Sequence, residues 1–279
     1  MILVTGATGN VGRELVKLLL ADGQDVAAVS RNPTHAAIPA GVGIVGGDPS
    51  HPETLASALK GVEAIFLIPR AVGAATADLL SLAANQNVKR VVAVSAVTVE
   101  YGGGYRRFAE EFKAVEDAAK ASGLQWTFLR CAQFDTNALV WAPQIRASRI
   151  VRGAYGDAAV SPIHPRDIAS VGARALVDPD YAGHAYALTG PQSLSQRDQV
   201  RLIGEAVGVD LSWQEITPEQ VRQAMISQGV PEEIPDRMLG YLAECLRRPG
   251  PSTGVVQELL GRPALTFAEW ATENTGAFQ

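Results

Sequence analysis

The chain has 279 residues, 47% of them hydrophobic, and a formal net charge of −5. This length and apolar content suit one large domain with a smaller lobe, and an acidic chain without a long basic cluster argues against nucleic-acid binding. No apolar stretch approaches the roughly 20 residues that span a bilayer, and no signal peptide is recognisable. Cys131 and Cys245 show neither metal nor redox spacing, so we expect reduced thiols in a cytoplasmic protein without a bound metal.

The N-terminal stretch joins a short apolar run, Ile2 to Val4, to three glycines spaced three residues apart. A helical pattern follows and ends at Gly23, a natural C-cap. A strand, a glycine turn and a helix in this order bind a dinucleotide pyrophosphate, because the turn lets the backbone approach the phosphates and the helix N-terminus faces them. We therefore expect cofactor contacts from Gly6, Thr8, Gly9, Asn10, Val11 and Gly12.

The end of the second predicted strand, Val26 to Val29, should approach the adenosine ribose. An acidic residue there favours NAD(H), whereas an arginine pairs with the 2′-phosphate of NADP(H). Arg31 occupies this place, with Ser30 and Asn32 as further hydrogen-bonding residues. The sequence therefore favours NADP(H), with NAD(H) as the alternative. The alternative interpretation of Arg31 is a solvated surface residue.

Three further strands complete an alternation of strands and helices, and they end at Asp48, at Ile68 and Pro69, and at Ser95. Their ranges are 42–45, 64–68 and 90–94. Ser50 and Glu53 resemble a capping box that opens a helix to about residue 59. The alternation predicts an α/β fold with a doubly wound parallel sheet, in which ligands bind outside the C-terminal strand ends. Asp48, Ile68, Pro69 and Ser95 join the cofactor-binding prediction on that ground.

The chain resembles the NmrA-like group of atypical short-chain dehydrogenases/reductases over nearly its whole length. The group includes NAD(P)H:quinone oxidoreductases and cofactor-sensing regulators, and it implies a Rossmann domain, a smaller, mostly helical C-terminal lobe and a dinucleotide between them. The segments that carry the resemblance are Gly6-Ala-Thr-Gly-Asn-Val-Gly12, Ser30-Arg-Asn-Pro33, Gly47-Asp48, Gly61-Val-Glu-Ala-Ile-Phe-Leu-Ile68, Ala121-Ser-Gly-Leu-Gln-Trp-Thr-Phe-Leu-Arg130, Ile163-His-Pro-Arg-Asp167, Leu188-Thr-Gly-Pro191 and Thr266-Phe-Ala-Glu-Trp270.

The residues for proton transfer are less clear. Ordinary members of the wider superfamily use a serine with a Tyr-x-x-x-Lys pair, in which lysine lowers the tyrosine pKa. Ser95 stands where that serine would be, but no Tyr-x-x-x-Lys occurs in the chain. Lys113 lies one residue from a lysine that some related reductases use, and Glu116 matches a glutamate common in the group. We take Ser95 and Lys113 as the catalytic candidates, with a solvated helix face as the alternative for Lys113.

Reduction of a quinone needs no protein acid, because hydride passes directly from the nicotinamide and water supplies the proton. Phe134 and Asn137 follow a predicted strand over 127–130 and should flank the nicotinamide, and Trp141 should line the substrate side. Packing between the lobes is the alternative for all three. His164 is read as structural, and Asp167 as the N-cap of a helix over 168–177.

The sequence thus predicts a dinucleotide-binding domain over 1–150, to which 161–190 return, and a substrate-covering lobe over 191–279. Capping boxes are expected at Ser195 with Asp198 and at Thr266 with Glu269. The favoured function is an NADP(H)-dependent oxidoreductase that transfers hydride to a quinone-like or conjugated carbonyl small molecule. A non-enzymatic NADP(H)-sensing regulator and a cofactor-retaining isomerase, epimerase or dehydratase are the alternatives, and the oligomeric state stays open.

Overall fold

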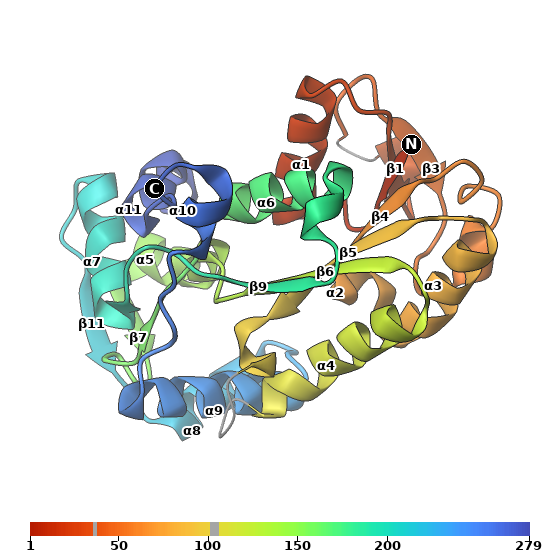
Figure 1. Ribbon diagram of the computed structural model, residues 1–279. Helices are drawn as coiled ribbons and strands as arrows, with labels where there is room; N and C mark the ends of the chain where they lie inside the picture. The colour runs from red at the N-terminus through yellow and green to blue at the C-terminus, as the bar shows by residue number, and fades with distance from the viewer. Residues whose placement is uncertain (36–37, 101–105) are drawn as a thin grey trace. The chain divides into compact units, whose positions relative to one another are not determined.

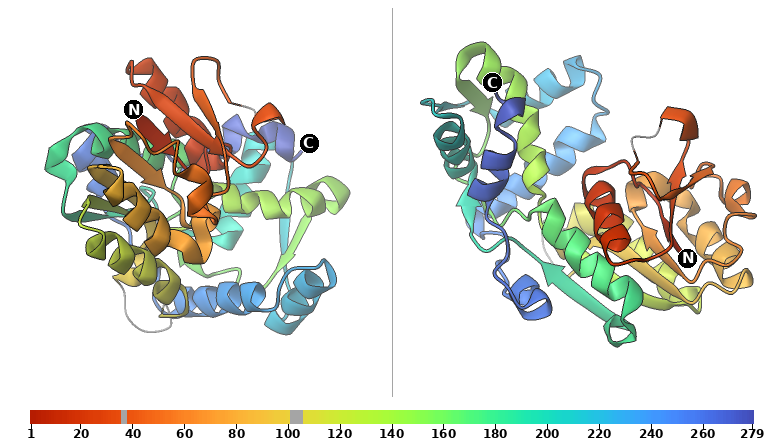
Figure 2. Two further views of the ribbon diagram at one scale, coloured as in Figure 1. Left: turned by 90° about the vertical axis from the view of Figure 1, so that its right-hand side faces the viewer. Right: turned by 90° about the horizontal axis from the view of Figure 1, so that it is seen from above.

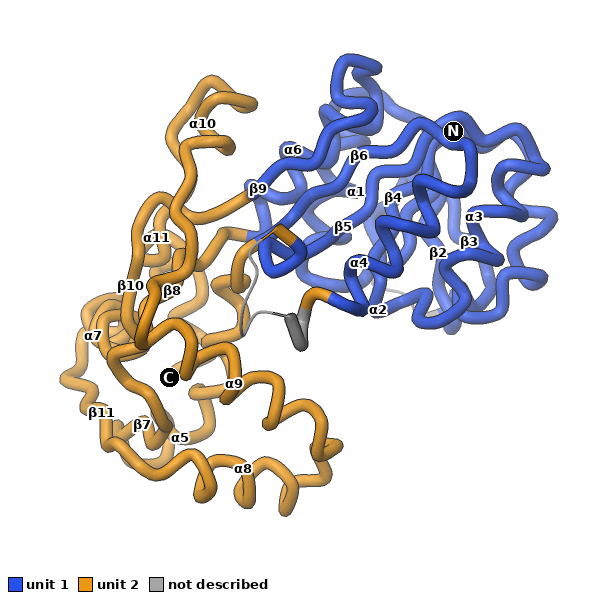
Figure 3. The backbone as a smooth tube through the Cα atoms, turned by 60° about the horizontal axis from the view of Figure 1, so that its bottom comes forward, with its two compact units in different colours: residues 1–99, 110–131, 165–187 blue, residues 100–109, 132–164, 188–279 orange. Residues whose placement is uncertain are grey.

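The computed structural model describes residues 1–35, 38–100 and 106–279 (Figure 1). The chain forms two compact units, each assembled from separate segments (Figure 3). Unit 1 comprises Met1–Val99, Glu110–Cys131 and Pro165–Ala187, and unit 2 comprises Glu100–Ala109, Ala132–His164 and Leu188–Gln279. The second segment of unit 1 ends at Cys131, whereas the sequence analysis extends the dinucleotide-binding domain to residue 150. The predicted division into a dinucleotide-binding domain and a substrate-covering lobe stays a prediction.

Unit 1 is built on a seven-stranded sheet in the order β3-β2-β1-β4-β5-β6-β9. The neighbours from β3 to β6 pair in parallel. All residues of β1 and β4 are buried, as strands covered on both faces require. The doubly wound parallel sheet is therefore confirmed. Its strands are β1 (Ile2–Val4), β2 (Val26–Ser30), β3 (Gly43–Gly46), β4 (Ala64–Leu67), β5 (Arg90–Ala96), β6 (Gln125–Cys131) and β9 (His184–Leu188).

Helices cover both faces of this sheet. On one face, α1 (Asn10–Ala21) packs beside α6 (Pro165–Val177), as Figure 2 shows. Gly172 brings α6 so close to β4 that a Cβ atom would lie 2.8 Å from the Phe66 ring. On the other face, α3 (Thr76–Asn85) and α4 (Arg106–Ala121) pack in one buried cluster with strand residues such as Ile65. The shorter elements of unit 1 are η1 (Pro33–His35), η2 (Pro52–Leu55), α2 (Pro69–Val72), η3 (Gly73–Ala75), η4 (Val97–Val99) and η7 (Pro179–Tyr181).

Unit 2 combines helices with two small sheets. In one, β7 (Ile150–Gly153) pairs in parallel with β11 (Ser212–Glu215), and in the other β8 (Ala159–Val160) pairs antiparallel with β10 (Leu194–Ser195). A buried aromatic pair, Phe267 and Trp270 with ring centroids 5.3 Å apart, lies in its core. Its helical elements are η6 (Asp135–Trp141), α5 (Ala142–Ser148), α7 (Gln196–Val207), α8 (Pro218–Ser227), α9 (Glu233–Arg247), α10 (Val255–Leu260), α11 (Phe267–Glu273) and η8 (Thr275–Ala277).

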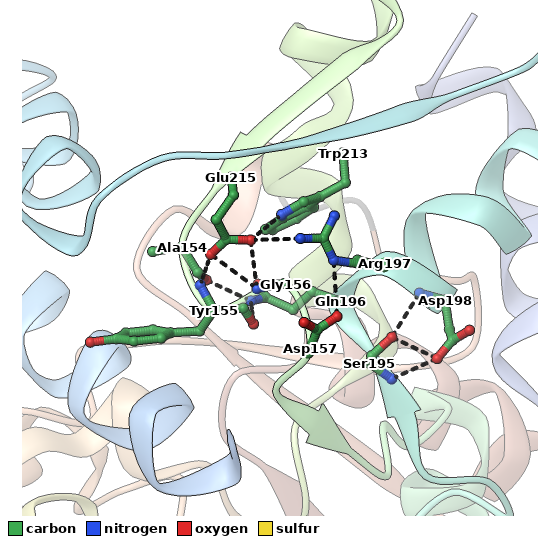
Figure 4. A network of polar contacts seen from close by, with 10 residues as sticks. All are labelled: Ala154, Tyr155, Gly156, Asp157, Ser195, Gln196, Arg197, Asp198, Trp213 and Glu215. Atoms are coloured by element: carbon green, nitrogen blue, oxygen red, sulfur yellow. Dashed lines mark hydrogen bonds and ion pairs between the residues drawn. The ribbon is translucent and has the colours of Figure 1, made fainter. Parts of the chain in front are cut away.

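The Glu215 carboxylate ties β11 to the turn after β7 (Figure 4). It accepts hydrogen bonds from the backbone N–H of Tyr155 at 2.5 Å and from that of Gly156 at 3.2 Å. The Trp213 indole and the Arg197 guanidinium donate to it at 2.7 and 3.1 Å. Tyr155 has a φ of +63°, which a bulky residue adopts only where its surroundings impose it. The Glu215 network therefore holds this turn in a strained conformation.

The structure corrects two local expectations. Ser50 caps no helix, because its hydroxyl donates to the Asp48 carboxylate at 2.7 Å, and only the short 3₁₀ turn η2 follows. Asp167 lies inside the first turn of α6 and is not its N-cap, since the helix already begins at Pro165. Proline is favoured at the first helical position because its fixed φ suits the helix and its missing N–H would be unpaired there.

Other expectations are confirmed. The capping boxes of α7 and α11 form as predicted, with reciprocal bonds between Ser195 and Asp198 and between Thr266 and Glu269. The helix that the sequence pattern predicts near 76–85 is present as α3 with these bounds. The sequence patterns indicated neither β7 nor α10.

Candidate functional site

The glycine turn after β1 is shaped by close backbone contacts. Gly6 has a φ of +63°, and a Cβ atom there would lie 3.1 Å from the Ile68 side chain. The Gly9 N–H donates to the Gly6 carbonyl oxygen at 2.9 Å. A Cβ atom at Gly12 would overlap that same oxygen and lie 2.7 Å from the Ala7 Cα. Gly6 and Gly12 therefore have to be glycines for α1 to start this close to the turn.

The N-terminus of α1 is open for an anion. Gly9 is its N-cap, no side chain caps it, and no acidic residue lies in its first turn. Thr8 and Asn10 are exposed beside it, whereas Val11 is buried. The first N–H groups of a helix lack partners and carry partial positive charge, so they attract phosphate. The six predicted turn residues thus lie together, and the turn fits a dinucleotide pyrophosphate.

Thr5 couples this turn to the end of β4, a role that the sequence analysis missed. Its buried hydroxyl donates to the Phe66 carbonyl oxygen at 3.0 Å and accepts from the Ile68 N–H at 2.9 Å. Ile68 in turn packs on Gly6, and Pro69 follows at the start of α2. The only sequence signal was a polar residue between an apolar strand and a glycine.

Arg31 and Asp48 follow neighbouring strands, β2 and β3, at the same sheet edge. Arg31 is exposed, and its positive charge helps to lower the pKa of Asp48. The main cause of that lowered pKa is the hydrogen bond from the Ser50 hydroxyl, followed by the one from the Ser50 N–H. His51 lies 3.7 Å from the other carboxylate oxygen. Asp48 thus serves first to fix its own turn, and its predicted cofactor contact stays a prediction.

Ser95 belongs to a buried polar network. Its hydroxyl donates to the Glu116 carboxylate at 2.8 Å, and the Arg130 guanidinium donates to both oxygens of that carboxylate at 2.9 and 2.8 Å. Ser95 is 2% exposed and Glu116 is 1% exposed. The network joins β5, α4 and β6, which favours a positioning role for the Ser95 hydroxyl. A catalytic role for Ser95 stays a prediction.

Lys113 lies elsewhere on α4. Its ammonium pairs with the Asp117 carboxylate at 2.5 Å, one helical turn away, and its side chain is 61% exposed. This is the surface pair that the alternative interpretation described, and the structure does not bring Lys113 to the Ser95 hydroxyl. A catalytic role for Lys113 stays a prediction too.

The three predicted substrate residues lie in unit 2. Phe134 bridges to Ile163 and precedes η6, on which Asn137 is exposed. Trp141 is 8% exposed and packs edge-on against Trp213, with ring centroids 6.1 Å apart. The structure thus places Trp141 in the unit 2 core. Contacts of these three residues with a substrate stay predictions.

Among the residues that the structure describes, no group of three or more potential ligands is arranged to hold a metal ion. No helix within 1–35, 38–100 and 106–279 combines the length and apolar character needed to cross a membrane. Cys131 and Cys245 are both buried, and burial raises the pKa of Cys131 far above its ordinary value. Burial of the Cys131 thiol disfavours its thiolate form.

A doubly wound sheet whose first strand ends in an open glycine turn defines a dinucleotide-binding protein. More specifically, the chain belongs to the NAD(P)H-binding family, whose family model matches residues 6–179. The resemblance to the NmrA-like atypical short-chain dehydrogenases/reductases is confirmed.

Named relatives cover the full chain. The chain is 35% identical over 283 residues to (4-alkanoyl-5-oxo-2,5-dihydrofuran-3-yl)methyl phosphate reductase of Streptomyces griseus, spanning 100% of this chain and 99% of that protein. It is also 35% identical over 293 residues to NAD(P)H azoreductase of Xenophilus azovorans, with coverage of 100% and 99%. The crystal structure of an NADPH-dependent quinone oxidoreductase from Escherichia coli complexed with NADPH matches with a TM-score of 0.83 at 25% identity, covering 98% of this chain and 99% of that chain.

Proposed function

We propose that the protein is an NADP(H)-dependent reductase that transfers hydride to a quinone-like or conjugated carbonyl small molecule. The main support is that two full-length relatives, each at 35% identity, are named as reductases. Their names describe electron-poor double bonds: an azo group in one, and a dihydrofuranone with ring and alkanoyl carbonyls in the other. These relatives favour the reductase over the sensor and isomerase alternatives.

The residues of this chain would hold and orient the cofactor. The N–H groups at the start of α1 would bind the pyrophosphate, with Gly6 and Gly12 allowing the close approach. Ile68 would keep the turn in place through its contact with Gly6. Bound NADPH would supply the hydride. Since the chain lacks a Tyr-x-x-x-Lys pair, the protein would contribute proximity and orientation, and water would supply the proton.

Arg31 supports a preference for NADP(H). It follows β2 directly and is exposed, and no carboxylate stands at the end of that strand. Its exposed guanidinium would pair with a 2′-phosphate at this edge of the sheet. A bidentate guanidinium–phosphate contact is among the stronger hydrogen-bonded pairs.

The test is a titration of NADPH and NADH into the wild type and the Arg31→Ala variant, followed by a quinone panel with NADPH. Loss of a charge-assisted phosphate contact should weaken NADPH binding by about 10- to 100-fold. NADH binding should change by less than about twofold, because NADH has no 2′-phosphate. Arg70→Ala, which changes an exposed arginine in α2 just after β4, is the control and should leave the NADPH-to-NADH affinity ratio unchanged.

Two results would contradict the proposal. An equal loss of affinity for both cofactors in Arg31→Ala would place the ribose end elsewhere. Failure of the wild type to oxidise NADPH with any quinone or conjugated carbonyl would favour the sensor alternative.

The cytoplasmic location also stays a prediction, and fractionation of the native host's cells tests it.

A further inference from the structure

Two hydroxyl groups near the end of β5 differ in their hydrogen bonds. Ser95 lies inside the strand, and its proton is committed to the Glu116 carboxylate at 2.8 Å. Thr98 lies three residues later, in η4, and is 5% exposed. The Thr98 Oγ1 atom is shielded from water and has no hydrogen-bond partner in the described part of the chain.

A buried hydroxyl without a partner destabilises a folded protein, because it loses its bonds to water and gains none. Such groups are uncommon, and a binding partner outside the chain is one physical reason for them. The Thr98 hydroxyl therefore keeps an unused donor and acceptor, whereas the Ser95 hydroxyl already donates to Glu116.

The topology assigns Thr98 to one half of the cofactor site. In a doubly wound sheet the first three strands form one mononucleotide-binding half, and the next three form the other. The glycine turn and Arg31 follow β1 and β2, in the half that takes the adenosine end. Thr98 follows β5, in the second half, which takes the nicotinamide end.

We propose that the Thr98 hydroxyl binds the nicotinamide carboxamide, and that Ser95 instead anchors the Glu116–Arg130 pair. A hydroxyl both donates and accepts, which suits a primary amide that presents one carbonyl and one NH₂ group. The proposal rests on the proposed cofactor, and it gives Ser95 a structural role in place of the cofactor contact that the sequence pattern predicted.

The test is Thr98→Val, which removes the hydroxyl and nearly keeps the shape. Binding is measured by calorimetry with NADPH and with 2′-phospho-ADP-ribose, which has every part of NADPH except the nicotinamide. Loss of one neutral hydrogen bond should weaken the affinity for NADPH about tenfold and leave the affinity for 2′-phospho-ADP-ribose unchanged. Without ligand, the melting temperature should rise by about 2 to 4 °C, because the unpaired hydroxyl is gone. Thr98→Ser should keep most of the NADPH affinity.

Two variants serve as controls. Ser161 has a second buried, unpaired hydroxyl, in unit 2, and Ser161→Ala should raise the melting temperature without changing NADPH affinity. Ser95→Ala should lower the melting temperature, because Glu116 loses a donor.

Unchanged NADPH affinity in Thr98→Val would overturn the inference, and so would an equal loss for both ligands. In both cases the wild type still binds NADPH, so the proposed cofactor stands. If the wild type binds neither ligand, the cofactor proposal and this inference fall together.

Discussion

Replacing Arg130 by methionine should expose how much the buried network contributes to stability. The change removes two charge-assisted hydrogen bonds, at 2.9 and 2.8 Å, from a carboxylate that is 1% exposed. In the part of the chain that the structure describes, the Ser95 hydroxyl at 2.8 Å and the Lys120 ammonium at 3.9 Å would remain near Glu116. Removing one partner of a buried ion pair lowers the free energy of unfolding by about 3 to 5 kcal/mol. Because Ser95 and Lys120 still stabilise the Glu116 carboxylate, we expect a loss of about 3 kcal/mol.

The assay should isolate unit 1, because two compact units do not have to unfold together. Hydrogen exchange of the β5 and β6 amides reports on the network, and the β7 and β11 amides in unit 2 provide an internal reference. Lys113→Met is the matched control on the same helix. Its partner Asp117 is 54% exposed, so the loss of stability in Lys113→Met should stay below about 0.5 kcal/mol. Turnover by this variant would at the same time test the predicted catalytic role of Lys113.

A double variant, Arg130→Met with Glu116→Leu, completes the test. If the single variant suffers because a carboxylate is left unpaired, removing that carboxylate should restore about 2 kcal/mol. The reasoning would be refuted if the double variant lost the sum of the stabilities lost by Arg130→Met and Glu116→Leu alone. A loss of stability below about 1 kcal/mol in Arg130→Met would refute it too.

Two further predictions concern the turn and the helix caps. Gly12→Ala should lower the melting temperature by more than about 5 °C and abolish NADPH binding, because its Cβ would meet the backbone of Gly6 and Ala7. Gly240→Ala in α9 meets nothing within 4 Å and should not lower the melting temperature, so it is the control in the same thermal scan. Asp198 has a lowered pKa, chiefly through the Ser195 hydroxyl, so its contribution is complete above the unfolded pKa of about 4 and is lost as the pH falls through the folded pKa. Asp198→Asn should thus melt about 1 to 2 °C below the wild type at pH 7 and level with it near pH 2, and a gap that persists in acid would contradict this assignment.

The features that could be predicted from the sequence are mostly local. The Gly6–Gly12 turn, α3 and the caps of α7 and α11 depend on residues within a few positions of one another. The parallel order of the sheet followed from alternation, because crossover rules leave few arrangements.

The features that escaped prediction depend on distant pairs. Glu116 was singled out, but nothing in the sequence says that Arg130 and Ser95, which lie 14 and 21 positions away, both bind it. The β7 strand pairs with β11 about 60 residues later, so its short sequence carried no recognisable signal. Ser50 is a local exception: it had a capping pattern, but its hydroxyl donates to the Asp48 carboxylate two positions earlier and caps no helix.

The position of α6 in the chain has a consequence for synthesis on the ribosome. This helix covers β4 and packs beside α1, and Gly172 lies against Phe66, yet residues 132–164 of unit 2 are made first. At about 5 to 20 residues per second, α6 is completed roughly 2 to 10 s after β6. During that interval the apolar face beneath it is exposed to molecular chaperones, and a nascent chain released near residue 150 would keep that face uncovered.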